Sequence, residues 1–474
     1  MVARHFISLC QRPANRETAC KGGAGSGHQA ARGHHIGPRF NTGPLVAPVT
    51  VPLFDAGSDI QMITTLRTTA WLVALACLAG ACTRPPPAPA SPQEARWLTY
   101  FPSSYEESRK RFREDCRRQV ASPDDFCGSF PVASPTDKDL TIDYGFFGRG
   151  NDRLVVIQSG IHGSEAIPGA AVQELVLKEY LSRLLDRHFD VFLIHALNPY
   201  GFKYVRRTDE FNVNLNRNFA LDARDYGKQN PDYERLRNLF EPAGPVHDVG
   251  LSAMGIHARF IGHVIGDGFN ATPVTIGLDS GQYLHPKGMN YGGQTPAQQV
   301  SFLRNTLAPV MARPYRKILF LDFHTGLGKN GELAIIEGIR PPRALLGEFA
   351  QLIERHEQDG IVIHSGSDAG FFPTSGDVID FVPSLVSPSD PRVLALTMEY
   401  GTMGIDTFSQ LRSASRMILE NRAHFYPCTK NDSAPCAEIR EDFRTLFSPP
   451  DQAWRLQVMR EANLTFSRLL DWDR

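Results

Sequence analysis

Side chains able to bind a metal stand directly after apolar runs of strand length. His162 and Glu165 follow the run LVVIQSG, and His324 follows KILFLDF. His162 and Glu165 lie in a Gly-containing turn, where two side chains can point at one ion without the constraint of a helix. Two imidazoles and one carboxylate are a common ligand set of catalytic zinc, which keeps one position open for water. The residue types therefore predict a metal site, if folding brings the three together.

Further polar residues follow other apolar runs. Arg206, Arg207, Asn216 and Arg217 come after DVFLIHAL. Glu399 directly follows VLALTM. In open α/β sheets, ligands bind in the crevice outside the carboxyl ends of the strands. Four segments therefore direct two histidines, two glutamates and three arginines toward one edge, and this convergence is stronger evidence than any single motif.

Each element alone also has a structural explanation. A His-x-x-Glu pair recurs by chance, so His162 could be a hydrogen-bonded loop histidine. His324 could be a buried, satisfied histidine, and Glu399 could form a structural salt bridge at a strand end. Arg206-Arg207 could be a solvated basic pair. Only a common location in the fold separates the functional interpretation from these alternatives.

The elements that must position these residues alternate along the chain. Apolar runs predict strands at 154–160, 190–197, 317–323, 360–366 and 393–401. Residues 167–185 carry apolar side chains at helical spacing, with Pro168 suited to a first turn. Continuous apolar strands interleaved with helices indicate a largely parallel sheet covered on both faces. Residues 220–310 interrupt the rhythm and are interpreted as a partly helical insertion that could cover the site.

The sequence resembles the zinc carboxypeptidase superfamily, which includes the aspartoacylase and succinylglutamate desuccinylase deacylases. The matching segments are GIHGSEAIPG, HALNPYGFKYVRR, NVNLNRNF, LDFHTGLG, SGDVIDF and LTMEYGT, which occur in the family's order across about 150–405. The resemblance implies a three-layer α/β sandwich, with a mixed, mainly parallel central sheet and helices on both faces. It also implies one Zn²⁺ per chain, held by His162, Glu165 and His324.

Other roles follow from the same resemblance. Asn216 and Arg217 resemble the pair that grips the substrate's terminal carboxylate. Arg206 or Arg207 resembles the arginine that polarises the scissile carbonyl, and Arg207 is the preferred candidate. Glu399 resembles the general base and acid. The implied reaction is hydrolysis of an amide next to a free carboxylate, on a small peptide or N-acyl amino acid.

Two positions depart from the family pattern. Asn214 stands where an aspartate usually hydrogen-bonds a zinc-ligand imidazole. An asparagine can accept that hydrogen bond but brings no charge, so we expect weaker metal binding rather than loss of the site. The mobile tyrosine of digestive carboxypeptidases has no counterpart soon after SGDVIDF, although Tyr283 or Tyr291 could substitute.

The N-terminal region predicts export. Residues 1–61 show no periodicity and are interpreted as a disordered extension or as no part of the working protein. Residues 62–82 resemble a secretory leader whose apolar core is too short to span a bilayer. Cys82 could be acylated as in a bacterial lipoprotein, or ordinary cleavage could occur nearby. A Pro-rich linker at 83–95 then leads to a catalytic domain at 96–474.

The remaining cysteines agree with export to the periplasm or to a membrane-anchored position. Cys116 and Cys127 form one close pair in sequence, and Cys428 and Cys436 form another. Neither has the spacing of a structural zinc site, so two local disulfides are expected in an oxidising compartment. Four unpaired thiols are the alternative.

Composition limits the remaining classes of function. The chain is 42% hydrophobic and 21% charged, which is typical of a globular protein. Its formal net charge of -1 gives no electrostatic support for a nucleic-acid partner. Three hypotheses remain: a zinc carboxypeptidase or cell-wall-peptide amidase, a deacylase of small N-acyl amino acids, and a metal-poor binding module that has lost catalysis.

Overall fold

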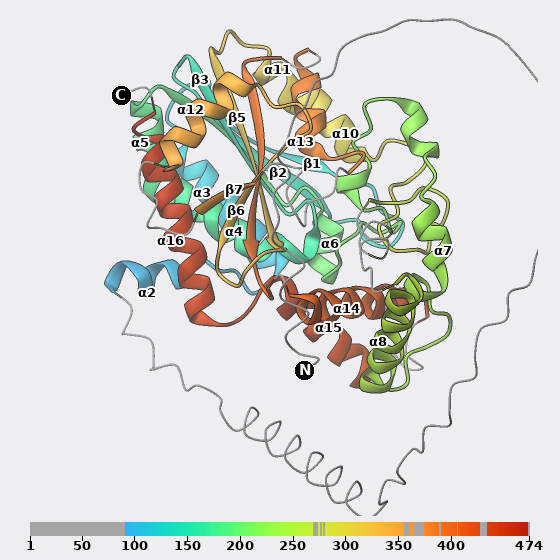
Figure 1. The fold of residues 1–474 in the computed structure, drawn as a ribbon. Coiled ribbons are helices and arrows are strands. Elements are labelled where there is room, and N and C mark those ends of the chain that lie inside the picture. The colour runs from blue at the N-terminus through green and yellow to red at the C-terminus, as the bar shows by residue number, and fades with distance from the viewer. Residues whose placement is uncertain are drawn as a thin grey trace, which may run out of the picture. The chain divides into compact units, whose positions relative to one another are not determined.

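The computed structural model describes residues 91–472, apart from 269–273, 275–276, 278–279, 355–360, 365–373, 388–389, 405 and 427–433. Within these residues, one eight-stranded sheet forms the centre, in the order β1-β2-β4-β3-β5-β8-β6-β7 (Figure 1). The strands are β1 Phe126–Pro131, β2 Thr141–Phe147, β3 Arg153–Ser159, β4 Phe189–His195, β5 Lys317–Gly326, β6 Leu333–Glu337, β7 Ile361–His364 and β8 Val393–Gly401.

The middle of this sheet is parallel. β3 pairs in parallel with β4 and β5, and β5 pairs in parallel with β8. The outer pairs β1–β2, β2–β4 and β6–β8 are antiparallel, while β6–β7 is parallel. The five predicted strands correspond to β3, β4, β5, β7 and β8, so the prediction of a mixed, mainly parallel sheet is confirmed. Strands β1, β2 and β6 were not predicted.

Helices cover both faces of the sheet, as Figure 1 shows. Alternate residues of β3 point to opposite faces, so Val155 and Ile157 join one apolar cluster while Leu154 and Val156 join the other. The helices of the first cluster are α2 Pro92–Leu98, α3 Tyr105–Gln119, α4 Ala166–Leu175, α5 Leu181–Asp186, α12 Arg343–Glu354 and α16 Gln452–Leu469. A π-helical turn, Val176–Tyr180, joins α4 to α5.

The second face is covered by shorter elements. These are α10 Gln298–Phe302, the π-helical turn Leu303–Leu307, α11 Ala308–Met311, α13 Val378–Phe381 and the 3₁₀ turn Val382–Leu385. Two covered faces make the three-layer sandwich that the motif resemblance implies, and that prediction is confirmed. Because α10 and α11 belong to this layer, the last part of the predicted insertion at 220–310 is part of the sandwich itself.

A separate helical cluster holds the rest of the insertion. α7 Pro231–Phe240 and α8 Val249–Gly266 pack with α14 Thr407–Phe425 and α15 Ala434–Phe447 around their own apolar core. A short 3₁₀ helix, Ala223–Gly227, precedes α7. The insertion is therefore partly helical, as predicted.

The start of the described chain differs from the prediction in one respect. α2 begins at Pro92 with a capping box between Ser91 and Glu94, so the last residues of the predicted linker are helical. The disulfide Cys116–Cys127 ties α3 to β1, as expected. Cys436 is also disulfide-bonded.

Several predictions concern residues outside the described chain. The extension at 1–61, the leader at 62–82 with Cys82, and Cys428 all lie there. Among the helices that are described, none has both the length and the apolar character needed to cross a bilayer.

Candidate metal centre

A tight turn after β3 positions the first two candidate ligands. Gly160 has a φ of +66°, and His162 precedes the 3₁₀ turn Gly163–Glu165, which leads into α4. A Cβ on Gly163 would lie 1.9 Å from the backbone of Gly201, in α6 Pro199–Tyr204. Only glycine permits this approach, which holds the turn against α6 and fixes the position of Glu165.

Two neighbouring strands supply the other side of the site. His324 lies near the end of β5, and its register partner in the parallel strand β8 is Glu399. Asp322 lies two residues before His324, so both side chains point to the same face of β5. The parallel pairing therefore brings Glu399 and His324 to the carboxyl end of the sheet, as the sequence predicted.

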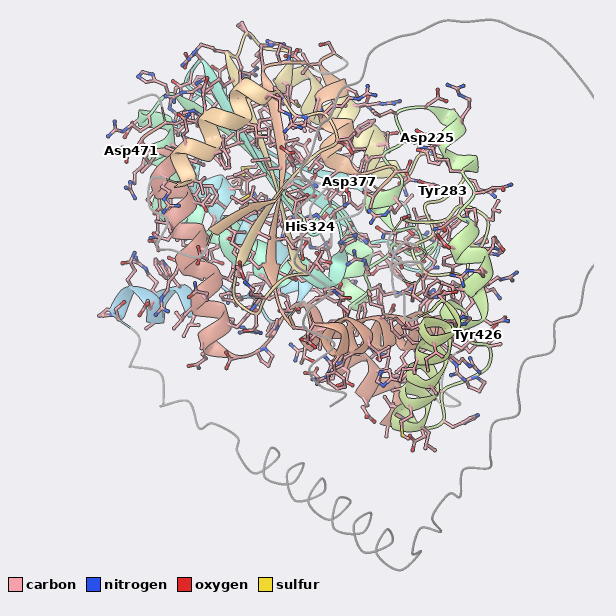
Figure 2. The ribbon with its side chains drawn as sticks, viewed as in Figure 1. Asp225, Tyr283, His324, Asp377, Tyr426 and Asp471 are labelled. Atoms are coloured by element: carbon pink, nitrogen blue, oxygen red, sulfur yellow. A yellow bond between two sulfur atoms is a disulfide. The ribbon has the colours of Figure 1, made fainter. Side chains whose placement is uncertain are left out.

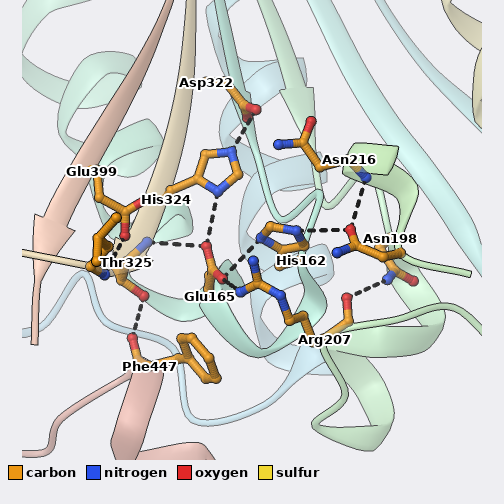
Figure 3. A network of polar contacts seen from close by, with 12 residues as sticks. His162, Glu165, Asn198, Arg207, Asn216, Asp322, His324, Thr325, Glu399 and Phe447 are labelled. Atoms are coloured by element: carbon orange, nitrogen blue, oxygen red, sulfur yellow. Dashed lines mark hydrogen bonds and ion pairs between the residues drawn. The ribbon is translucent and has the colours of Figure 1, made fainter. Parts of the chain in front are cut away.

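His162, Glu165 and His324 form a compact, buried cluster (Figure 3). One ligand atom from each lies within 4.8 Å of the others. The Nδ1 of His162 is 3.0 Å from Oε1 of Glu165, and the Nδ1 of His324 is 3.1 Å from Oε2. The two imidazole centroids are 5.0 Å apart. The structure thus brings together the three residues that were predicted to share an ion.

The outer nitrogen of each imidazole has its own partner. Nε2 of His162 lies 3.0 Å from Oδ1 of Asn214, and Nε2 of His324 lies 2.7 Å from Oδ2 of Asp322. If each Nε2–H donates to its partner, each Nδ1 presents a lone pair toward Glu165. Consistent with this, the buried Nδ1 of His162 makes no hydrogen bond to any residue that the structure describes. Three acceptors converging on one point fit a divalent cation.

Charges around the cluster shift the two histidines in opposite directions. Burial and the Arg207 guanidinium lower the pKa of His162 to about 4, which keeps its imidazole neutral. Burial would lower the pKa of His324 too, but the Asp322 and Glu165 carboxylates raise it well above the ordinary value. Burial likewise opposes ionisation of Glu165, yet His162 and Arg207 lower its pKa well below the ordinary range. Glu165 is therefore ionised, and its carboxylate is the negative group that faces both imidazoles.

The adjacent arginines face in different directions. Arg207 donates from Nη1 to Oε1 of Glu165 at 2.7 Å and lies over the Phe447 ring. Arg206 is buried elsewhere, where its Nε donates to Glu420 at 2.8 Å and its Nη2 to Asn212 at 3.0 Å. Of the two arginines, only Arg207 therefore borders the cluster of His162, Glu165 and His324.

Asn216 and Arg217 lie in the 3₁₀ turn Leu215–Arg217, beside the N-terminus of α13. The Asn216 amide is engaged at both ends, since Nδ2 donates to Asp377 at 3.1 Å and Oδ1 accepts from the Val378 N–H. Nη1 of Arg217 is 3.9 Å from Oδ2 of Asp377. His324 and Asp377 lie near one another (Figure 2). Burial raises the pKa of Asp377 by more than the positive charge of His324 lowers it.

Glu399 is buried beside the cluster. Its Oε1 accepts a hydrogen bond from the Leu327 N–H at 2.8 Å, and among the described residues nothing bonds its second oxygen. Burial and the nearby Glu165 carboxylate raise the pKa of Glu399 to about 7. A carboxylate with such a pKa can both accept and release a proton near neutral pH.

With the site described, comparison with known proteins identifies the family. Residues 101–461 match the model of a protein family described as "Protein of unknown function (DUF2817)". The chain belongs to this DUF2817 family. No curated protein matches the sequence.

Three of the solved structures to which the chain is similar are the following. Carboxypeptidase A from Helicoverpa armigera has 13% identity and a TM-score of 0.39, with 73% of this chain and 74% of that chain covered. Bovine thrombin-activatable fibrinolysis inhibitor, in complex with tick carboxypeptidase inhibitor, has 14% identity and a TM-score of 0.39, covering 70% and 98%. A succinylglutamate desuccinylase from Silicibacter has 15% identity and a TM-score of 0.32, covering 63% and 68%.

Two carboxylates of this DUF2817 protein lie at the site without having been predicted there. Asp322 supports His324, and its signal was the Asp-x-His spacing on one strand, since residues two apart share a face. Asp377 lies within the SGDVIDF segment, whose partner Asn216 is far away in sequence, so no local spacing could reveal the pair.

The two tyrosines considered as substitutes have structural surroundings. The Tyr283 hydroxyl donates to the Arg217 carbonyl at 2.8 Å and is buried. Tyr291 packs in the apolar cluster on the second face of the sheet, and its carbonyl accepts from the Asn214 N–H. Neither residue is the loosely held phenol that the family pattern would require.

Proposed function

We propose that this chain is a zinc-dependent hydrolase that cleaves an amide bond next to a free carboxylate, as a carboxypeptidase or a cell-wall-peptide amidase. One observation carries the proposal. The Nδ1 atoms of His162 and His324 face the two oxygens of Glu165, while their Nε2 atoms are held by Asn214 and Asp322. A purely structural histidine pair has no need to present two inner nitrogens to one carboxylate in a buried site.

The donor set favours zinc over other common ions. Two imidazoles and one carboxylate match catalytic zinc sites, whereas Mg²⁺ and Ca²⁺ prefer oxygen ligands. A zinc ion held there would supply a Lewis acid for the substrate carbonyl and lower the pKa of a water ligand to about 7. The remaining chemistry belongs to the side chains of the chain itself.

Glu399 moves the protons in this proposal. Its carboxylate takes one proton from the attacking water as the new C–O bond forms. The same proton then passes to the leaving amine as the C–N bond breaks, so Glu399 ends the cycle unchanged. The second Glu399 oxygen is the group available for this transfer, because Oε1 already accepts from Leu327.

Arg207 stabilises the negative charge that develops on the carbonyl oxygen. Its guanidinium borders the cluster and is held between Glu165 and the Phe447 ring. Loss of one such donor typically slows an enzyme about 100- to 1,000-fold. Arg206 is assigned no catalytic part, since Glu420 and Asn212 occupy its side chain.

Arg217, positioned by Asn216, is the proposed anchor for the substrate carboxylate. A guanidinium can hold a carboxylate with two charge-assisted hydrogen bonds. The neighbouring Asp377 would oppose this if ionised, but burial raises the pKa of Asp377 despite the nearby Arg217 charge. When Asp377 is protonated, it carries no charge to neutralise Arg217, and the guanidinium attracts the substrate carboxylate more strongly.

The decisive experiment screens the zinc-loaded protein against small peptides and N-acyl amino acids. We expect turnover of a substrate with a free carboxylate, and weaker turnover of its amidated counterpart. The matched control is Glu399→Gln, which keeps the shape of the side chain and should retain zinc while losing hydrolysis. Full activity in Glu399→Gln would contradict the proton-transfer assignment.

The two alternative functions are a deacylase of small N-acyl amino acids and a binding module without catalysis. A deacylase uses the same site, and preference for N-acyl amino acids over peptides would select it. The binding module without catalysis rested on Asn214, yet Asn214 makes the expected hydrogen bond to His162. Retention of Glu399 beside three ligands also opposes it, because a binding protein has no need for a proton carrier.

Export is part of the proposal. The disulfide Cys116–Cys127 supports it, because such bonds persist in oxidising compartments. We propose cleavage of the leader and acylation of Cys82, giving a lipid-anchored or periplasmic protein. Mass spectrometry of the exported protein should show a lipid on Cys82, and an unmodified N-terminus beyond that residue would contradict the anchor.

A further inference from the structure

α8 has two apolar faces, of which only one is covered. The inner face packs against α7 and α14 through Val249, Ala253, Ile256, Phe260 and Val264. The outer face exposes large side chains to 51–68%, and these are Leu251, Met254, Ile261 and Ile265. A helix that is apolar all round is normally buried on every side. The helix lies at the edge of the described fold in Figure 1, and its outer face lacks a partner within the described chain.

The exposed side chains follow the spacing of a helix-pairing seam. Leu251, Met254, Ala258, Ile261 and Ile265 are separated by three, four, three and four residues. This is the period at which two helices pack along a common line. An outer face that only meets water has no reason to keep such a seam over two heptads.

Charge on α8 favours a protein partner over a lipid surface. The helix contains no acidic residue, and Arg259 is its single arginine or lysine. Helices that lie on membranes carry many basic residues on a polar face, whereas α8 has one arginine and packs a second side into the core of the helical cluster. Depletion of charge with enrichment in Met and large apolar groups is typical of the core of a homodimer interface.

Size differences across the seam point to self-association. Met254 and Ile261 form a bulky row, while Gly255 and Gly262 form a row beside it where an added Cβ would meet nothing within 4 Å. Glycine disfavours a helix interior, so its presence on an exposed face needs a reason outside this helix. A two-fold axis running along two parallel helices places the bulky row of each against the glycine row of the other.

We propose that α8 packs in parallel against α8 of a second copy of this chain. An 18-residue helix is about 27 Å long and about 10 Å wide, so the seam supplies about a third of the ~800 Å² that each partner buries in a standard interface. The dimer is consequently weak and concentration-dependent. It does not involve His162, Glu165 or His324.

Sedimentation equilibrium of the full chain tests this over about 1 to 300 µM. The average mass should rise from one chain toward two across this range. Ile261→Lys should sediment as a single copy throughout, with an unchanged melting temperature because the side chain is half exposed. Leu221→Lys is the matched control, since Leu221 is 63% exposed outside α8 and should leave the dimer intact.

A cysteine placed at one end of the seam tests the direction of pairing. Leu251→Cys should form a disulfide-linked dimer under mild oxidation, because parallel packing places the two copies of residue 251 together. Adding Ile261→Lys should abolish the crosslink. A single-copy mass at every concentration, a dimer that survives Ile261→Lys, or a Leu251→Cys dimer without crosslink would each overturn the proposal. Binding to phosphatidylglycerol vesicles by a chain that never self-associates would assign the face to lipid instead.

Discussion

Arg207 donates a hydrogen bond to Glu165 at 2.7 Å. The residue proposed to stabilise the oxyanion is therefore bonded to a proposed metal ligand. The residue immediately before it, Arg206, is turned away and is paired with Glu420. Two neighbouring arginines of the same charge therefore stand in different environments, and substitution should separate their roles.

Arg207→Met should lower kcat/KM about 100- to 1,000-fold, because one stabilising donor for the carbonyl oxygen is lost. Zinc content and melting temperature should stay close to those of the unchanged protein. The matched variant Arg206→Met should instead lower the free energy of unfolding by about 3–5 kcal/mol, since it leaves the Glu420 carboxylate, whose side chain is only 12% exposed, without its arginine. Denaturant unfolding and steady-state kinetics measure the two effects, and an exchange of these phenotypes would refute the assignment.

His324→Ala should reduce bound zinc well below one equivalent per chain. The substitution removes one of the three ligand atoms that converge within 4.8 Å. Elemental analysis after dialysis measures the loss. A buried histidine outside the cluster, His195, provides the control, because His195→Gln should leave the zinc content unchanged. Undiminished zinc in His324→Ala would remove this residue from the ligand set.

The outer partners of the imidazoles should tune metal affinity in opposite directions. Asp322→Asn should weaken zinc binding about 10- to 100-fold, because a charged partner of His324 becomes neutral. Asn214→Asp makes the reverse change beside His162 and should strengthen binding. Competition with a chelator of known affinity measures both. Equal affinities in all three proteins would show that these partners do not act on the ligands.

The pH dependence of kcat/KM should show an acid limb set by Glu399. A general base works only when deprotonated, so activity is lost as the pH falls through its pKa. Burial and the Glu165 charge raise the pKa of Glu399 to about 7. A zinc ion bound to Glu165 would offset the negative charge of that carboxylate and lower the pKa of Glu399. The acid limb of the zinc-loaded protein should therefore lie below pH 7. A profile that is flat between about pH 5 and 8 would contradict the assignment.

Much of the fold was predictable because the apolar runs are continuous. β3, β5 and β8 are buried on both faces, so their sequences contain few polar residues and stand out from their surroundings. β1 and β2 were missed because they lie toward the edge of the sheet and carry Gly, Ser and Asp among their apolar residues. The place of α10 in the sandwich came only from the structure, because composition alone does not reveal which layer a helix joins.

The sequence by itself determined which side chains could form the metal cluster. His162 and Glu165 follow one apolar strand and His324 lies near the end of another, and parallel strands bring such positions to one edge of the sheet. That inference needs only strand direction, which the order of strands and helices along the chain already implies.

Only the tertiary structure decided which further side chains reach the cluster. Arg206 and Arg207 are adjacent, and neighbouring residues in a loop can face opposite ways, so packing against Glu420 and Phe447 separates them. The pairing of Asp377 with Asn216 and the bare outer face of α8 depend on contacts between segments far apart in the chain. Such contacts are set by how the layers stack, and no local pattern of residues encodes them.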